Sequence, residues 1–318
     1  AGAVCLLEVT RYWTPSVLPL ALLALQIDFA VIMLSAGIYK FTAGYPKNHG
    51  MELGLCNPMW GYWWRWYSTK PPDSWVFWTL NQLGWSTEII AAVLMVVPAT
   101  REIGGLFIVL IFLVICTQIR LGFLTEMVMV CALIYLSPTH VLGGAVESWL
   151  SPGPAAPEVI AGSGMLTAML RMGLLGYLAL LPLAHAGLYY NFYAGRSLPR
   201  LLQRALERYT NFFGIILWRV FSVDIINFFV RQSRRGSGQD VALPPLGSWP
   251  RYNHVGEMIC LASLFTTLKY YPSNNQIFRE RVLRYARTVP REPGERVVFE
   301  YVSVVKRCLL YTSPSPRD

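Results

Sequence analysis

The chain has 318 residues, of which 54% are hydrophobic and 14% are charged, and its mean hydropathy is +0.40. A soluble globular domain carries about 25% charged residues, so this composition excludes an ordinary soluble protein and indicates a membrane protein. The formal net charge is +9. Because the basic residues lie beside apolar segments and no nucleic-acid-binding motif accompanies them, we expect contact with anionic lipid headgroups and no nucleic acid partner.

Five apolar segments are candidates for crossing a bilayer, which takes about 20 residues of helix. They are Val17–Lys40, Trp78–Pro98, Gly104–Gln118, Gly122–Leu136 and Leu166–Tyr190. The third and fourth would together form a helix of roughly 50 Å if the polar run Thr117–Arg120 and the following Gly122 did not separate them. The sequence therefore predicts an α-helical integral membrane bundle of about five spans, with residues 1–195 as the transmembrane domain.

An aromatic loop at 41–77 separates the first two segments and is dense in Trp, Tyr, Pro and Gly. Trp and Tyr side chains favour the headgroup level of a membrane, where one part of the ring is dry and the other wet. The loop is therefore predicted to lie on the membrane or to cap the bundle. A substrate-binding aromatic pocket is the alternative.

Several polar side chains lie inside or beside the apolar segments. An ionisable group at membrane depth is costly and nearly always faces the bundle interior, where it finds a partner. We therefore predict an intramembrane polar cluster, structural or functional, formed by Asp28, Glu88, Gln118, Arg120 and Glu126. If the protein were an enzyme, its weak catalytic candidates would be Lys40, Glu88, Arg120 and His185. No Cys or His spacing typical of a metal or redox site occurs, so no metal and no cofactor are predicted.

A basic amphipathic helix is predicted over 196–213. Its arginines recur every four residues, which places them along one side of a helix, and they are Arg196, Arg200, Arg204 and Arg208. Such a helix lies in the membrane interface, where each basic residue near acidic headgroups contributes about 1 kcal/mol. The four arginines are therefore predicted to contact lipid headgroups.

Residues 214–307 are predicted to form a small soluble α+β unit. Phe221–Val230 has the β-branched and aromatic enrichment of a strand, although Ile215–Val230 is nearly long enough for a sixth span. The remaining expectations are a flexible linker over 233–250, helices over 254–271 and 275–288, and a strand over 297–306. The loop at 137–163 contains no Lys or Arg.

Charge in the loops predicts the first loop and the C-terminal unit on the cytoplasmic side, with 137–163 outside. The membrane would be a bacterial inner membrane or that of the endoplasmic reticulum. The chain opens on Ala1 without Met, and 308–318 resembles translated sequencing adapter. We therefore expect the natural protein to extend further at both ends and leave 308–318 out of the fold prediction.

Several stretches resemble the lipase maturation factor family, part of the horizontally transferred transmembrane (HTTM) superfamily that also includes vitamin K-dependent gamma-carboxylase. The similar stretches include Ser35–Lys40, the aromatic stretch Asn57–Trp78, Glu88, Pro98–Arg101 and Asn211–Gly214. The resemblance covers most of 32–305. It implies a helical membrane domain followed by a soluble domain on the lumenal or outer side, opposite to the side that loop charge predicts.

Two functions follow from these observations. The first is a non-catalytic membrane factor that assists folding or assembly of a client protein, as the resemblance implies; the chain offers no phosphate-binding loop, zinc motif or nucleophile motif. The alternative is an intramembrane enzyme of the carboxylase-like class, acting on a lipid, quinone or peptide substrate.

Overall fold

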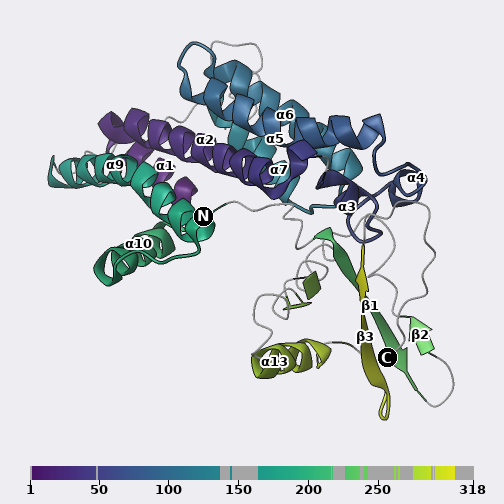
Figure 1. Ribbon diagram of the computed structural model, residues 1–318. Helices are drawn as coiled ribbons and strands as arrows, with labels where there is room; N and C mark the ends of the chain where they lie inside the picture. Colours follow the sequence, from purple (N-terminus) through teal and green to yellow (C-terminus); the bar gives the residue numbers. More distant parts are fainter. Residues whose placement is uncertain are drawn as a thin grey trace. The chain divides into compact units, whose positions relative to one another are not determined.

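The computed structural model describes residues 2–47, 49–136, 144, 164–215, 217, 226–236, 240–242, 261–262, 264–265, 275–287, 289 and 291–304 (Figure 1). The chain divides into two compact units. Unit 1 comprises 1–39, 86–110 and 128–219, and unit 2 comprises 40–85, 111–127 and 220–318.

The described residues before 137 are mostly helical. Their helices are α1 (Gly2–Tyr12), η1 (Pro15–Val17), α2 (Leu18–Ala43), η2 (Tyr45–Lys47), α3 (Met51–Leu55), α4 (Trp64–Tyr67), α5 (Trp75–Val96), α6 (Arg101–Gln118), α7 (Leu124–Ala132) and η3 (Leu133–Tyr135). The later elements are α9 (Gly164–Ala194), α10 (Arg200–Phe213), β1 (Phe228–Arg235), β2 (Asp240–Ala242), α13 (Asn275–Ala286) and β3 (Arg296–Ser303).

Helices occupy all five segments predicted to cross a membrane. Among the described residues, three helices are long and apolar enough for a crossing, and these are Pro15–Ala43, Arg101–Gln118 and Gly164–Ala194. The apolar helix over Leu124–Tyr135 is shorter. The predicted break between the third and fourth segments is confirmed, because α6 ends at Gln118 and Gly122 adopts a φ of +59° that side chains other than glycine rarely tolerate.

Unit 1 is organised by the pairing of α2 with α9. Leu174 packs against Val17, Ala21 and Ala24, and further along the same pair Leu181 and Ala184 pack beside Ile27 and Val31. Helix α10 follows α9, and its Leu206 packs in the same cluster as Leu181 and Ala184. Gly187 contributes to close packing at this junction, since a Cβ there would lie 2.9 Å from a Leu206 methyl carbon and the leucine side chain would have to move.

Unit 2 contains an antiparallel sheet of order β2-β1-β3. β1 pairs with β3 along its whole length, from Phe228 opposite Ser303 to Arg235 opposite Arg296. Phe228 and Val230 alternate inward along β1, as strand periodicity requires, and they share one core with Leu55 of α3 and Phe77 of α5. The described strands therefore share their core with α3 and α5, and the small soluble α+β unit at 214–307 stays a prediction.

The C-terminal predictions were partly correct. Helix α13 and strand β3 agree with the predicted helix over 275–288 and strand over 297–306. The predicted linker over 233–250 was wrong in part, because β1 continues to Arg235 and 240–242 forms β2. A sixth span reaching Val230 is likewise excluded, since β1 begins at Phe228. Residues 218–225, most of 254–271 and nearly all of the loop at 137–163 lie outside the described residues.

Candidate interfacial sites

The aromatic loop of unit 2 is attached to the turn between α6 and α7. Gly61 pairs with Ile119 as in a short antiparallel bridge, and the Tyr62 amide donates to the Gln118 carbonyl oxygen at 3.0 Å. The Arg120 amide donates to the Trp60 carbonyl oxygen at 2.8 Å. Glycine is needed at position 61 for a separate reason, because a Cβ there would lie 2.1 Å from the Leu55 carbonyl oxygen.

Arg120 completes the attachment. Its Nη1 donates to the carbonyl oxygens of Pro58 at 2.9 Å and Gly61 at 3.1 Å, and its guanidinium lies 4.7 Å from the centre of the Tyr62 ring. Partial burial lowers the pKa of Arg120 from its ordinary value. The described geometry therefore gives Arg120 a structural task, that of fixing the aromatic loop.

Buried polar side chains hold the other end of the loop, and the sequence analysis did not single them out. Glu52 accepts hydrogen bonds from the Gly50 amide and from Asn81 of α5, both at 2.9 Å, while Asn81 accepts one from the Met51 amide at 2.9 Å. The sequence could have pointed to Glu52 and Asn81, since both are polar residues with apolar neighbours in the chain. A buried polar group costs free energy unless it is paired, and here each pairs with loop backbone or with the other.

A further buried side chain, Asn57, joins the loop to the sheet. Its Nδ2 donates to the carbonyl oxygens of Ile226 and Phe228, both at 2.9 Å, and its Oδ1 accepts from the Met59 amide at 2.9 Å. Asn57 thereby satisfies backbone groups next to the beginning of β1. The loop is consequently connected both to the α6–α7 turn and to the sheet of unit 2.

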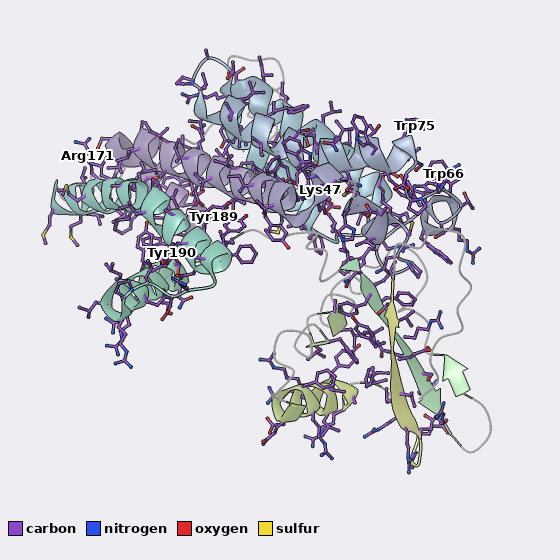
Figure 2. All side chains as sticks on the ribbon, viewed as in Figure 1. Lys47, Trp66, Trp75, Arg171, Tyr189 and Tyr190 are labelled. Atoms are coloured by element: carbon purple, nitrogen blue, oxygen red, sulfur yellow. The ribbon has the colours of Figure 1, made fainter. Side chains whose placement is uncertain are left out.

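Two tryptophans of the loop remain on the outside. Trp63 and Trp66 are 58% and 48% exposed, and with Tyr67 and Gln118 they line an open hollow of about 400 Å³. Trp66 is labelled in Figure 2, as is Trp75 at the beginning of α5, which is 77% exposed. We call the four lining residues the aromatic hollow. Burial raises the pKa of the Tyr67 hydroxyl, which keeps it protonated as a donor.

The rings of the aromatic hollow are held by independent contacts. Trp63 Nε1 donates to the Thr117 carbonyl oxygen at 3.0 Å, and the Tyr67 hydroxyl donates to Gln118 Oε1 at 2.8 Å. Trp66 and Tyr67 meet edge to face with their centres 4.8 Å apart, and Lys70 Nζ lies 4.5 Å from the centre of the Trp66 ring. These contacts fix the orientation of the rings before any ligand arrives.

In unit 1, helix α10 is strongly amphipathic. At about 100° per residue, Leu202, Ala205 and Leu206 fall on the apolar side, and Arg200 and Glu207 fall on the opposite, polar side. Leu206 packs on α9, and so do the rings of Tyr209 and Phe213. Toward the other edge of the apolar side, Leu201 and Phe212 stay 79% and 83% exposed. The predicted arginines are all exposed, but Arg196 precedes the helix, which begins at Arg200.

The predicted polar residues of unit 1 have partners near them. Asp28 Oδ1 accepts a hydrogen bond of 2.6 Å from the Tyr177 hydroxyl and interacts electrostatically with His185. His185 is 5% exposed, its Nδ1 lies 3.1 Å from the Leu181 carbonyl oxygen, and its Nε2 has no hydrogen-bond partner among the described residues. Glu88 is buried on α5.

The remaining predicted residues belong to unit 2. Lys40 is buried near the end of α2, Gln118 forms part of the aromatic hollow, and Glu126 accepts a hydrogen bond of 2.8 Å from the Thr125 hydroxyl. The structure therefore brings Asp28 close to His185, and it assigns Gln118, Arg120 and Glu126 to the other unit from Asp28 and Glu88. One polar cluster of all five predicted residues stays a prediction.

Comparison with protein-family models, curated proteins and solved structures finds no significant match to this chain. The resemblance to the lipase maturation factor family therefore rests on the sequence stretches named above and stays a prediction.

Proposed function

We propose that this chain is an integral membrane protein that acts by binding, as a non-catalytic factor assisting the folding or assembly of a client protein. The observation that best supports integration into a membrane is the succession of helices α9 and α10. Helix α9 has the length and composition of a span, and it leads through five residues into a helix whose apolar side is largely uncovered. A helix of this kind is suited to the plane of the membrane interface.

The binding part is supported by what the polar residues do. Arg120, a candidate for catalysis, donates to loop carbonyl oxygens, and Gln118 accepts from Tyr67. These hydrogen bonds hold the aromatic loop and the aromatic hollow in place, which is a structural role for both side chains. The choice of a client protein as the partner rests on the family resemblance alone.

One observation favours the enzyme alternative. The open Nε2 of buried His185, with Asp28 nearby, is the kind of group that an intramembrane base requires. His185→Gln separates the two functions. A binding factor would keep its client and its client's activity, whereas an enzyme would remain abundant and lose a small-molecule product.

The proposal is tested in two steps. Membranes containing the chain are washed with alkaline carbonate, and the protein should stay in the pellet; its release would contradict the membrane proposal. The protein is then purified from native membranes in mild detergent. A stoichiometric co-purifying enzyme supports the client proposal, whereas a bound small molecule without a protein partner supports the enzyme alternative.

A further inference from the structure

We propose that the aromatic hollow binds the quaternary ammonium of a phosphocholine lipid headgroup. This inference rests on the membrane location proposed above and adds the chemical class of the ligand. The hollow is open, has a volume of about 400 Å³, and is lined by the rings of Trp63, Trp66 and Tyr67 together with Gln118.

Aromatic rings attract cations through the negative potential of their faces, and tryptophan does so most strongly. The hollow already shows this chemistry, because the Lys70 ammonium lies 4.5 Å from the centre of the Trp66 ring. A quaternary ammonium has no N–H group to donate, so removing its water costs less free energy than removing the water around a lysine ammonium. Aromatic rings can therefore replace the water around a quaternary ammonium more completely than the water around a lysine. An aromatic enclosure is the recurrent solution for such ligands.

Charge around the hollow complements the rest of the headgroup. The stretch from Asn57 to Pro72 contains two basic residues, Arg65 and Lys70, and no Asp or Glu. Arg65 is exposed next to Trp66 in α4. A phosphate attached two carbons away from the ammonium can pair with these cations, so the site offers rings for one charge of the headgroup and basic side chains for the other.

The position of the hollow along the chain favours a lipid as the source of this group. Gln118 is the last residue of α6, one of the three helices long and apolar enough to cross a membrane. In the proposed membrane arrangement the end of such a helix lies at headgroup level. The Thr117 carbonyl oxygen, which fixes Trp63, belongs to the same last turn.

The test uses the full chain in a detergent without choline, titrated with short-chain phosphatidylcholine or with phosphatidylglycerol of the same chain length. Nuclear magnetic resonance measures saturation transfer from aromatic protons to the choline methyl protons. We expect clear transfer in the wild type, and affinity for phosphatidylcholine at least roughly fivefold weaker in Trp63→Leu/Trp66→Leu, as the loss of two cation–π contacts predicts. Trp75→Leu is the matched control, because Trp75 is exposed in the same unit and is not among the residues lining the hollow; it should leave binding unchanged.

Equal affinity for the two lipids, or unchanged transfer in the folded double variant, would overturn the proposal. If the double variant fails to fold, Arg65→Gln decides in its place, because Arg65 is exposed and its guanidinium does not lie over a ring that lines the hollow. Phosphatidylcholine binding should weaken roughly twofold or more through loss of the phosphate contact, and an unchanged affinity would again overturn the proposal. The two proposals are tested separately, because the titration in detergent measures headgroup binding and the carbonate wash measures membrane insertion. Either result can be negative while the other is positive.

Discussion

The aromatic loop and helix α10 both expose large apolar side chains beside basic residues, but they are built in different ways. In the loop, Trp63 and Tyr67 are fixed by hydrogen bonds to α6, and Arg120 connects the backbone of the loop to the α6–α7 turn. In α10, Leu201 and Phe212 are largely exposed, and the Phe212 ring meets that of its neighbour Phe213 edge to face. A fixed set of rings can select the shape of a headgroup, whereas an amphipathic helix responds to apolar depth and to charge.

The difference predicts that the loop is far more sensitive to local substitution than α10. Gly61→Ala should have the largest effect, because the added Cβ meets the Leu55 carbonyl oxygen at 2.1 Å and the backbone must move. We expect a loss of about 3 kcal/mol or more in the free energy of unfolding, measured by thermal unfolding in detergent. Gly173→Ala is the control, since no described atom lies within 4 Å of a Cβ there. Equal stability of the two variants would contradict the close approach of Gly61 to the Leu55 carbonyl oxygen.

Arg120→Ala should be next in size. Removing the guanidinium leaves the carbonyl oxygens of Pro58 and Gly61 without this donor, which costs about 2 kcal/mol, and the loop should become a site of rapid limited proteolysis. Arg120→Lys should recover only part of the stability, because an ammonium lacks the planar fork. The exposed Arg204→Ala is the control and should be neutral within about 0.5 kcal/mol. A neutral Arg120→Ala would contradict the structural task given to this side chain.

In α10 the expected change concerns location and leaves stability nearly unchanged. Leu201→Glu/Phe212→Glu removes apolar area worth about 1.5–3 kcal/mol for each side chain that lipid covers. A fluorescent probe on a cysteine at Ala205, on the apolar side of α10, should emit at longer wavelength in this variant than in the wild type, in vesicles containing anionic lipid. The same probe at Glu207, on the polar side, serves as the control. Identical spectra at Ala205 with and without the substitutions would show that lipid does not cover α10.

A further prediction concerns the reactivity of a thiol in the aromatic loop and changes neither stability nor location. Burial raises the pKa of Cys56 to about 11 from the ordinary value of 9.0. Because the thiolate is the reactive form, a chain that keeps only this cysteine should react with maleimide at pH 8 about a hundredfold more slowly when folded than when unfolded. The rate should rise with pH up to the raised pKa. A folded rate equal to the unfolded rate would show that the loop around Cys56 opens readily.

The same comparison explains what could be predicted from the sequence. Helical periodicity and spacing are local, so α2, α5, α6, α9 and α10 were predicted within a few residues, and the break at Gly122 followed from its polar neighbours. The attachment of the aromatic loop depends on contacts between residues far apart in the chain, such as Asn57 with Phe228 and Trp63 with Thr117. No local pattern specifies such pairs, and the shared core of loop and sheet was missed for that reason.

The aromatic loop was predicted to lie on the membrane or to cap the bundle, with a substrate-binding pocket as the alternative. Three of its residues line a hollow, and its location and ligand stay predictions. The role of Arg120 was not foreseen, because its partners are backbone carbonyl oxygens, which the sequence does not distinguish from those of any other residue. Glu52 and Asn81 could have been found as polar positions in apolar surroundings, by the criterion that selected Glu88.

The most direct test is the depth of the two regions in a bilayer. Spin labels are placed one at a time at Trp66, Leu202 and Arg284 of the full chain in lipid nanodiscs, and depth is measured from collisions with oxygen and with a water-soluble nickel complex. Labels at 66 and 202 should report headgroup depth or deeper, and the label on the exposed α13 position 284 should report water. Labels at 66 and 202 that are as accessible to the nickel complex as the label at 284 would contradict the interfacial location of both regions.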